Sequence, residues 1–488
     1  MAYNMNDISS NIKKVMFIFL LCFIAVISYI TYFEIFVGPK IVRKPQNRRL
    51  WVERNKVLRG TITDRNGNPL TKSTKIDQES QKREYTGGAV FAHALGYCDP
   101  RYGLTGLESK YDQDLMADDL KIDINFFAKD KEKKEEKVGH SLRTTLDSNL
   151  QKLAFDLLGD NRGAVVAINP KTGEVLAMVS KPSFDPNDLK GLMTQINNAD
   201  KNAEILKHSP LINRVTQGLY PPGSTFKTVT AVSAIENMNG IMNRRINDTG
   251  KLPFNSKESL SNYEGEVLGN IGFKEAYTLS SNVYFGGLGL DLGNDKLKST
   301  AEKFFFNKDT PADGITIENS MFPTLKKNEK GNLAQSAIGQ GSVLASPMQM
   351  ALVTCTIAND GVMMKPHLVK DIINSKGKVI KEIAPESNGN IISAQTAKTM
   401  QDLMRSVVAN GTGTAANLQG LNVCGKTGTA DNRDSKGNAM APHSWFISFA
   451  PKDDPKVAVV VIVENGGTGG GKAASIAAKI IQSAVNIK

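Results

Sequence analysis

The sequence predicts an α+β fold in which one five-stranded antiparallel sheet is assembled from two distant parts of the chain. Two apolar segments, residues 163–168 and 174–179, flank a turn over 169–173 and predict a hairpin of mostly buried strands. Strand patterns return near the C-terminus, in 423–430, 444–450 and 456–464. Residues 200–420 are expected to be mainly helices and loops, so the two strand groups must meet across a long helical excursion.

The flanking segments complete this prediction. A stripe of Leu150, Leu153, Ala154, Leu157 and Leu158 predicts a helix directly before the first strand. Residues 473–487 predict a second helix at the C-terminus. Helices that are kept apart from an antiparallel sheet define the α+β class.

Near the N-terminus, residues 15–33 carry no charged side chain. A helix of this length spans about 28 Å, enough to cross a hydrocarbon core. A cleaved signal peptide is disfavoured because the apolar run is long and no small-x-small cleavage site follows. A buried core helix is also possible, but the run is apolar on every side. A single membrane anchor is therefore the preferred interpretation.

The orientation of this anchor is ambiguous from charge. Lys13 and Lys14 precede the span, and a larger basic group follows it: Lys40, Arg43, Lys44, Arg48 and Arg49. The positive-inside rule would place the body in the cytoplasm. The rule weakens when a long domain follows, because such domains translocate largely regardless of charge.

Between the anchor and the predicted sheet lies a smaller unit. Alternation over Thr61, Ile62 and Thr63 predicts a strand, and Asn66-Gly67 predicts a hairpin turn. Residues 129–137 are all charged and predict an exposed linker, so a boundary is placed near Gly139. The expected organisation is a short tail over 1–14, an anchor over 15–37, a small elongated pedestal over 38–139 and a catalytic domain over 140–488.

Composition excludes several classes of protein. The 488 residues carry a net charge of +11 that is scattered along the chain, and no zinc knuckle, arginine cluster or aromatic-basic pattern indicates nucleic-acid binding. The four cysteines, Cys22, Cys98, Cys355 and Cys424, have no CxxC spacing and predict neither a disulfide framework nor a metal site. Cys424 is expected to be a small buried apolar side chain.

Three short motifs carry the chemistry: Ser224-Thr225-Phe226-Lys227, Ser280-Ser281-Asn282 and Lys426-Thr427-Gly428-Thr429. Each motif alone is common. Their joint order, with Pro221-Pro222-Gly223 before the first and strands around the last, predicts one catalytic constellation. Serine and lysine three residues apart share a helix face, and a lysine that loses its charge can remove the serine proton.

The motif residues fall into distinct roles. Pro221-Pro222-Gly223 would present Ser224 at a helix start, where free N–H groups help to hold an oxyanion. Lys227 is the candidate base, since burial and a second cation, Lys426, would both lower its pKa. Ser280 could relay a proton between the two amines and the leaving group. Asn282 could fix Lys227 and a substrate amide by hydrogen bonds.

The third motif predicts a strand edge that binds a peptide. Gly428 lacks a Cβ, so a substrate backbone could lie close and pair as an added strand. The glycine-rich segment 466–472 nearly matches a phosphate-binding loop. Ala473 replaces the hydroxyl that such a loop needs for magnesium, so a flexible connection to the last helix is expected instead.

The chain resembles class B penicillin-binding proteins over nearly its whole length. Besides the three motifs, the resemblance rests on Arg59-Gly60-Thr61-Ile62-Thr63-Asp64-Arg65-Asn66-Gly67, Gly106-Leu107-Glu108, Gly173-Glu174-Val175-Leu176-Ala177, Pro182-Ser183-Phe184-Asp185-Pro186-Asn187 and Gly339-Gln340-Gly341. It implies a transpeptidase domain of the penicillin-binding and serine β-lactamase type, a dimerisation-type pedestal and one N-terminal anchor.

The resemblance also implies an activity. Ser224 would attack the penultimate D-Ala carbonyl of a peptidoglycan stem peptide, and an amine of a neighbouring strand would resolve the acyl-enzyme. The backbone N–H groups of Ser224 and Thr429 would form the oxyanion hole, and the Thr427 and Thr429 hydroxyls would take the substrate carboxylate. β-Lactams would trap Ser224 covalently. No metal or cofactor is implied, and nucleic acid is not an expected partner.

The location of the substrate implies an extracytoplasmic body held at the cell membrane by a single span. A membrane glycan polymerase of the SEDS type is the expected partner. The alternatives are a D,D-carboxypeptidase or β-lactamase on the same fold, or a non-catalytic scaffold of the cell-wall machinery. A penicillin-sensing receptor is a further alternative, but it usually needs more spans and a cytoplasmic effector.

Overall fold

The computed structural model describes residues 5–37, 51, 54–77, 80–117, 137–200, 205, 208–255, 258–434 and 437–487. The basic residues at 40–49 and the charged segment 129–136 lie outside these ranges. Their predicted roles therefore stay predictions.

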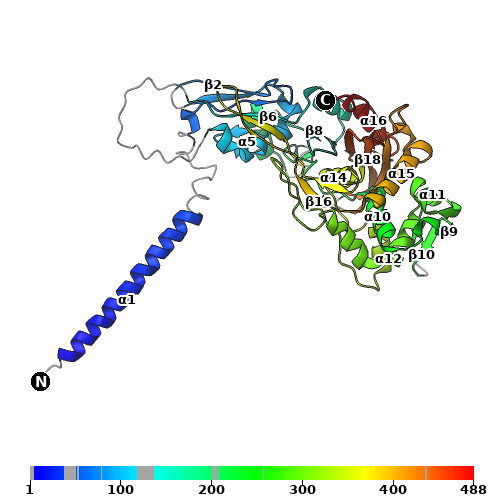
Figure 1. Cartoon of the computed structure of the whole chain (residues 1–488), viewed down its shortest axis with the longest axis horizontal. Coiled ribbons are helices and arrows are strands. Elements are labelled where there is room, and N and C mark those ends of the chain that lie inside the picture. The colour runs from blue at the N-terminus through cyan, green and yellow to red at the C-terminus, as the bar shows by residue number, and fades with distance from the viewer. Residues whose placement is uncertain are drawn as a thin grey trace.

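The core of the catalytic domain is a five-stranded antiparallel sheet with the strand order β17-β18-β19-β7-β8. Figure 1 labels two of these strands, β8 and β18. Its strands are β7 (Gly163–Ile168), β8 (Val175–Lys181), β17 (Cys424–Arg433), β18 (Ala439–Ala450) and β19 (Val457–Val463). The C-terminal strand β19 pairs with β7 from Ala458↔Ile168 to Val463↔Gly163. The predicted α+β fold and its closure across the helical excursion are confirmed.

Both faces of this sheet are covered, which explains why β7 and β19 are apolar without alternation. Every residue of β7 and β19 is buried. Val165 and Val459 face a cluster that includes helices α7 (Ser148–Leu158) and α16 (Lys472–Ala484). Val166 and Val460 face the opposite cluster, which contains α14 (Pro347–Ala358). Strands buried on both faces need no polar side.

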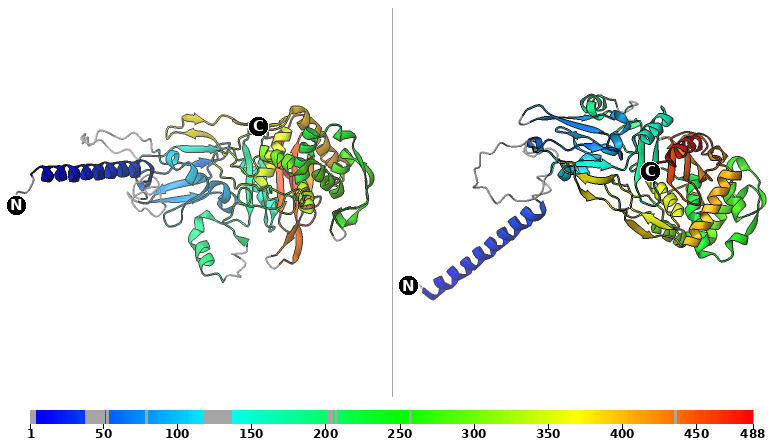
Figure 2. Two further views of the ribbon diagram at one scale, coloured as in Figure 1. Left: turned by 90° about the horizontal axis from the view of Figure 1, so that it is seen from below. Right: turned by 45° about the horizontal axis from the view of Figure 1, so that its top comes forward.

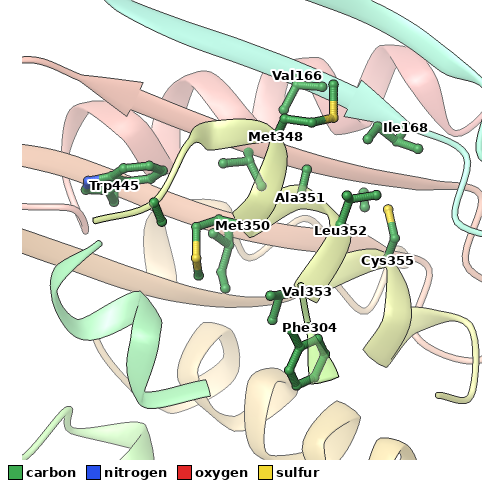
Figure 3. Close-up of a cluster of buried hydrophobic side chains, with 14 of the residues drawn as sticks. Val166, Ile168, Phe304, Met348, Met350, Ala351, Leu352, Val353, Cys355 and Trp445 are labelled. Carbon is green, nitrogen blue, oxygen red and sulfur yellow. The ribbon is translucent and has the colours of Figure 1, made fainter. Parts of the chain in front are cut away.

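Helix α14 is the central helix of the domain, and all of its residues are buried. Figure 3 shows it between the sheet, represented by Val166, Ile168 and Trp445, and Phe304 on its other side. Ser346 caps its start by accepting a hydrogen bond from the Gln349 N–H, and Pro347 occupies its first turn. A helix that is apolar all round belongs inside a core.

The long excursion between the two strand groups holds most of the remaining helices. They are α10 (Lys227–Asn237), α11 (Phe273–Thr278), α12 (Asn282–Lys303), α13 (Lys330–Ala337) and α15 (Ala394–Asn410). The excursion also contains short strands that the sequence did not predict: β9 (Arg245–Asp248), β10 (Lys251–Pro253), β11 (Ser259–Ser261), β12 (Gly269–Gly272), β13 (Val362–Met364), β14 (Val369–Ile373), β15 (Val379–Glu382) and β16 (Ser387–Asn390). Many are polar and exposed, so they lack an alternating apolar signal.

The pedestal shares a sheet with the catalytic domain. Strand β1 (Ile62–Thr63) pairs in parallel with β6 (Ser141–Thr144), which pairs in turn with β14. Backbone pairing therefore crosses the boundary predicted near Gly139. The predicted turn is present, because Gly67 has φ +90° and its N–H donates to the Asp64 carbonyl.

The other elements of the pedestal are short: β2 (Thr71–Lys75), β3 (Gln81–Tyr85), α4 (Ala92–Leu95), β4 (Cys98–Asp99), β5 (Gly103–Leu104), α5 (Gly106–Lys110) and α6 (Asp112–Leu115). Helix α8 (Leu189–Asn197) follows β8 in the catalytic domain.

The N-terminal helix α1 (Met5–Tyr32) continues as one π-helical segment, Phe33–Val37. Figures 1 and 2 show it apart from the folded body. Its apolar side chains are exposed, for example Phe17 at 60% and Phe23 at 66%. Residues 10–37 are long and apolar enough to cross a membrane.

Candidate active site

Ser224 lies in a short 3₁₀ helix, Gly223–Phe226, that leads directly into α10. We call residues 221–226 the serine turn. Pro221 and Pro222 end the preceding segment, as the sequence predicted, and Ser224 itself is half-buried. Phe226 anchors the turn, since its ring stacks on Phe322 with the centroids 5.6 Å apart.

Two glycines allow the serine turn to lie close to its neighbours. Gly223 has φ +54°, and a Cβ there would lie 2.7 Å from the Thr429 carbonyl oxygen on β17. Its N–H donates to the Gly339 carbonyl, and a Cβ at Gly339 would lie 2.3 Å from the Gly223 carbonyl oxygen. The turn is therefore held between β17 and the Gly339-Gln340-Gly341 loop.

Two lysine amines converge on one hydroxyl behind the serine turn. Lys227 donates to the Ser280 carbonyl (2.5 Å), to Asn282 Oδ1 (2.7 Å) and to Ser280 Oγ (3.2 Å). Lys426 donates to Ser280 Oγ (2.8 Å) and to the Thr427 carbonyl (3.1 Å). Both lysine side chains are completely buried. The second and third motifs thus meet the first, as the sequence predicted.

Burial changes the charge state of both amines. It lowers the pKa of Lys227 well below its usual value, the positive charge of Lys426 lowers it further, and Asp248 acts in the opposite direction. Burial lowers the pKa of Lys426 to about 7. A lysine with a lowered pKa is partly neutral near pH 7 and can accept a proton.

One predicted contact is not formed. Among the described residues, no hydrogen bond joins Lys227 Nζ to Ser224 Oγ, and the Lys227 amine is instead bound to Ser280 and Asn282. Asn282 also uses its amide Nδ2, which donates to the Ser261 carbonyl at 2.9 Å.

A cavity of about 590 Å³ opens in front of these groups. Its lining includes five predicted residues: Ser224, Ser280, Asn282, Thr427 and Thr429. Lys227 and Lys426 lie buried behind that wall. The three motifs therefore meet at one cavity. The third motif lies on an edge strand, because β17 is the last strand of the sheet.

The sequence suggested that Gly428 makes room for a substrate backbone, but in the structure it makes room for the serine turn. A Cβ at this position would lie 2.8 Å from Thr225 Cγ2 and 3.0 Å from the Pro222 carbonyl oxygen. The glycine therefore lets β17 approach the serine turn, and it is not among the residues that line the cavity. A larger residue would push the two motifs apart.

The glycine-rich segment 466–472 is more ordered than a flexible connection, which corrects that prediction. A Cβ at Gly469 would lie 2.4 Å from the Gly428 carbonyl oxygen, and the Gly469 N–H donates to Thr429 Oγ1 at 3.3 Å. Thr468 and Gly470 line the cavity. The glycines allow backbone to pack directly on β17, which local sequence could not reveal.

Comparison with known proteins supports the resemblance to penicillin-binding proteins that the sequence indicated. Residues 163–482 match the penicillin binding protein transpeptidase domain, and residues 59–139 match the penicillin binding protein A dimerisation domain. Peptidoglycan D,D-transpeptidase PbpA of Mycolicibacterium smegmatis is 32% identical, over 98% of this chain and 99% of that protein. PbpA of Mycobacterium tuberculosis is 30% identical over 93% and 94%.

Solved structures agree. The ceftriaxone acyl-enzyme complex of penicillin-binding protein A from M. tuberculosis superposes with a TM-score of 0.80, at 29% identity, over 89% of this chain and 99% of that one. A D,D-transpeptidase domain from Eggerthella lenta gives 0.77 at 31% identity, over 88% and 98%. The chain belongs to the penicillin-binding protein transpeptidase family. It is a peptidoglycan D,D-transpeptidase, an acyl transferase that works through a serine.

Sequence reasoning missed several residues of this penicillin-binding protein's cavity. Thr412 lies in a Gly411-Thr412-Gly413-Thr414 turn after α15, and its Oγ1 is 2.5 Å from Thr427 Oγ1. The wall also contains Tyr263, Glu266, Gln340 and Asp431. The threonine between two glycines was one local signal available. Gln340 lies in the Gly339-Gln340-Gly341 stretch that carried the resemblance, and Asp431 follows the third motif on β17. Tyr263 and Glu266 belong to no motif and reach the cavity only through the folding of the excursion.

Cys424 was predicted to be a small buried apolar side chain, and it is fully buried in β17. Burial raises the pKa of its thiol to about 12. A thiol with such a pKa is protonated at neutral pH and is a poor nucleophile.

Proposed function

We propose that Ser224 is the nucleophile of this transpeptidase and that the two buried lysines and Ser280 move its proton. Ser224 Oγ attacks the carbonyl of the penultimate D-Ala of a stem peptide. The proton passes to Lys227 and, through Ser280, to the leaving amine, so that the terminal D-Ala departs. An amine of a neighbouring stem then attacks the ester, forms the cross-link and restores Ser224.

One observation carries this proposal: both lysine amines bind Ser280 Oγ, at 3.2 Å and 2.8 Å, behind the turn that presents Ser224. Such an arrangement combines a neutralised amine with a hydroxyl relay, which is what proton transfer to and from a serine requires. Asn282 holds the Lys227 amine in place through its Oδ1.

The strand β17 is proposed to bind the substrate's tail. The Thr427 and Thr429 hydroxyls take the terminal carboxylate, and Gly428 between them keeps β17 close to the serine turn. The N–H groups of Ser224 and Thr429 form the oxyanion hole. Support comes from the position of both threonines on the wall of the cavity that contains Ser224.

The test is mass spectrometry of the full-length protein in detergent after exposure to penicillin. We expect an adduct on Ser224 that lasts for hours and is absent from Ser224→Ala. Turnover of the adduct within seconds would instead indicate a β-lactamase. A persistent adduct without cross-linked product from two stem peptides, but with released D-Ala, would indicate a D,D-carboxypeptidase.

A scaffold role is tested in cells. If Ser224→Ala fully restores growth and cross-linking to a strain that lacks the protein, catalysis by this chain is dispensable. The proposal expects no restoration.

We further propose a single-pass anchor over residues 15–37, with the tail 1–14 in the cytoplasm, the pedestal 38–139 and the catalytic domain 140–488 outside. The exposed apolar surface of α1 supports the anchor, and the extracytoplasmic location of peptidoglycan supports the orientation. A β-lactam that cannot cross the membrane should label the protein in intact cells; labelling only after lysis would reverse the orientation.

A SEDS-type glycan polymerase is the proposed membrane partner, and co-purification of the two full-length proteins in detergent tests it.

A further inference from the structure

Ser280 holds an unusual backbone conformation. Its φ is +62°, in the left-handed region that residues other than glycine seldom adopt. In this conformation its carbonyl accepts from Lys227 and its hydroxyl accepts from Lys426. Strained backbone of this kind persists only where the surrounding structure enforces it. The residues that hold Ser280 in this conformation therefore determine where its carbonyl and hydroxyl lie.

The residues next to Ser280 are tied to a buried carboxylate. Asp248, at the end of β9, is completely buried. It accepts hydrogen bonds from Ser281 Oγ (2.6 Å), from the Gly250 N–H (2.8 Å) and from Asn262 Nδ2 (2.9 and 3.0 Å). No ion pair of Asp248 is present among the described residues. Neutral donors thus replace a direct counterion.

Asn262 connects this carboxylate to the start of α12. Its Oδ1 accepts from the N–H groups of Asn282 (2.8 Å) and Val283 (3.0 Å). Ser281 Oγ accepts from the next N–H, that of Tyr284, at 2.9 Å. The free N–H groups at a helix start are usually bound by one capping residue. Here two side chains share them, and both are bound to Asp248.

We propose that Asp248 and Asn262 are positioning residues of the transpeptidase reaction, which hold Ser280 and Asn282 against the two lysines through Ser281 and the first turn of α12. The inference rests on the proposed roles of Lys227 and Ser280. Neither Asp248 nor Asn262 belongs to one of the three motifs, and both come from the β9–β11 region of the excursion. Asn262 also borders the cavity.

The charge of Asp248 gives this positioning a second consequence. The charged groups that act on Lys227 are Lys426 on β17, which lowers its pKa, and Asp248 on β9, which raises it. Removal of the Asp248 charge therefore lowers the pKa of Lys227 further. Loss of the Ser281 hydroxyl leaves that charge in place. It removes the hydrogen bond to Asp248 and the cap on the Tyr284 N–H, while the link through Asn262 remains.

The experiment measures the rate of penicillin acylation against pH for wild type, Asp248→Asn, Ser281→Ala and Ser346→Ala, each as the full-length protein. Ser346 is the matched control, because it is a fully buried capping serine on α14. Misplacement of catalytic groups can reduce rates by about a hundredfold. We expect Asp248→Asn and Ser281→Ala to lose about tenfold to a hundredfold at the optimum.

The pH profile separates a positioning role from a general loss of structure. The acid limb should move to lower pH in Asp248→Asn and much less in Ser281→Ala, while Ser346→Ala keeps both rate and profile. Ser281→Ala decides the outcome if Asp248→Asn does not fold. Wild-type rates in the folded variants, or an equal loss in Ser346→Ala, overturn the inference. Failure of the wild type to form a Ser224 adduct would instead overturn the proposed function.

Discussion

Two of the buried charge clusters in this protein use opposite pairings. In the pedestal, Glu108 is fully buried and accepts from Arg59 Nε at 2.6 Å and Arg83 Nε at 2.8 Å. In the active site, Lys227 and Lys426 are equally buried, and they share a serine hydroxyl without an ion pair among the described residues. Opposite charges that neutralise each other hold structure together, whereas like charges forced together alter protonation.

The pKa directions express this difference. Burial raises the pKa of Glu108, but Arg83 and Arg59 outweigh it and leave that pKa below its usual value, so the carboxylate stays charged. Burial lowers the pKa values of both lysines, and Lys426 lowers that of Lys227 further, so these amines lose charge. The pedestal cluster is expected to contribute to folding, and the lysine pair to chemistry at the expense of folding.

The largest effect is expected from removal of Lys227, the proposed base. Lys227→Met should reduce penicillin acylation by about 10²–10⁴-fold, the usual contribution of a general base. Stability should stay the same or increase, since a desolvated amine is replaced by an apolar side chain. Stopped-flow acylation and thermal unfolding measure the two effects. The control is Lys181→Met, a lysine whose amine donates to the Gly159 carbonyl away from the cavity; equal loss there would contradict the assignment.

The pedestal should respond in the reverse way. Glu108→Gln removes the carboxylate that Arg59 and Arg83 share, although Arg59 keeps its ion pair with Asp112 at 2.6 Å, and should lower the free energy of unfolding by about 3–5 kcal/mol. The acylation rate of the folded fraction should not change. Urea unfolding measures the loss, and Glu84→Gln, which removes an exposed pair with Lys82, should give no measurable change. An acylation defect in folded Glu108→Gln would show that the two clusters are coupled.

The pH dependence of stability should separate the clusters. The lysines have folded-state pKa values below the ordinary value of 10.5, so the unfolded chain binds protons that the folded chain does not, and stability rises as pH increases from about 7 towards 10.5. The Glu108 contribution is present above its ordinary pKa of 4.5 and is lost as pH falls through its lowered folded-state pKa.

The free energy of unfolding, measured from pH 3 to pH 10, tests both the acid loss and the alkaline rise. Lys426→Met should remove much of the alkaline rise and keep the acid loss, whereas Glu108→Gln should do the reverse. Identical profiles for the two variants would contradict the assigned protonation states.

A smaller effect is expected where the strand approaches the serine turn. In Gly428→Ala the new Cβ would meet Thr225 Cγ2 at 2.8 Å, so the serine turn must move away from β17. We expect a loss of about 1–3 kcal/mol in stability and about tenfold in acylation. Gly287→Ala on α12 is the control, because no atom lies within 4 Å of its added Cβ. Normal acylation by Gly428→Ala would show that the spacing of the two motifs is not critical.

Prediction from sequence succeeded where the signal is local. The spacing of Ser224 and Lys227 follows from one helical turn, and strands β7, β8 and β19 follow from runs of apolar residues that are buried. The order of the motifs indicated the site before any distance was known. The exposed apolar helix at the N-terminus was predicted for the same reason.

Prediction failed where a residue acts through a distant partner. Asp248 and Thr412 lie in no motif, and they come to the site only because the excursion folds back on β17 and α12. The ordered packing of Gly469 on Gly428 was missed because a glycine run is equally compatible with a flexible loop. The pairing of β1 with β6 depends on short strands whose partners are far along the chain.

The sequence by itself determined the reactive groups, the strands that support them and the family to which they belong, because residue type and short-range periodicity encode these features. Tertiary structure alone decided that two amines share the Ser280 hydroxyl, that Gly428 serves the approach of β17 to Ser224, and that Asp248 lies behind the second motif. Burial and the distance between charges arise only when remote segments pack together, and these two quantities set the pKa values on which the chemistry depends.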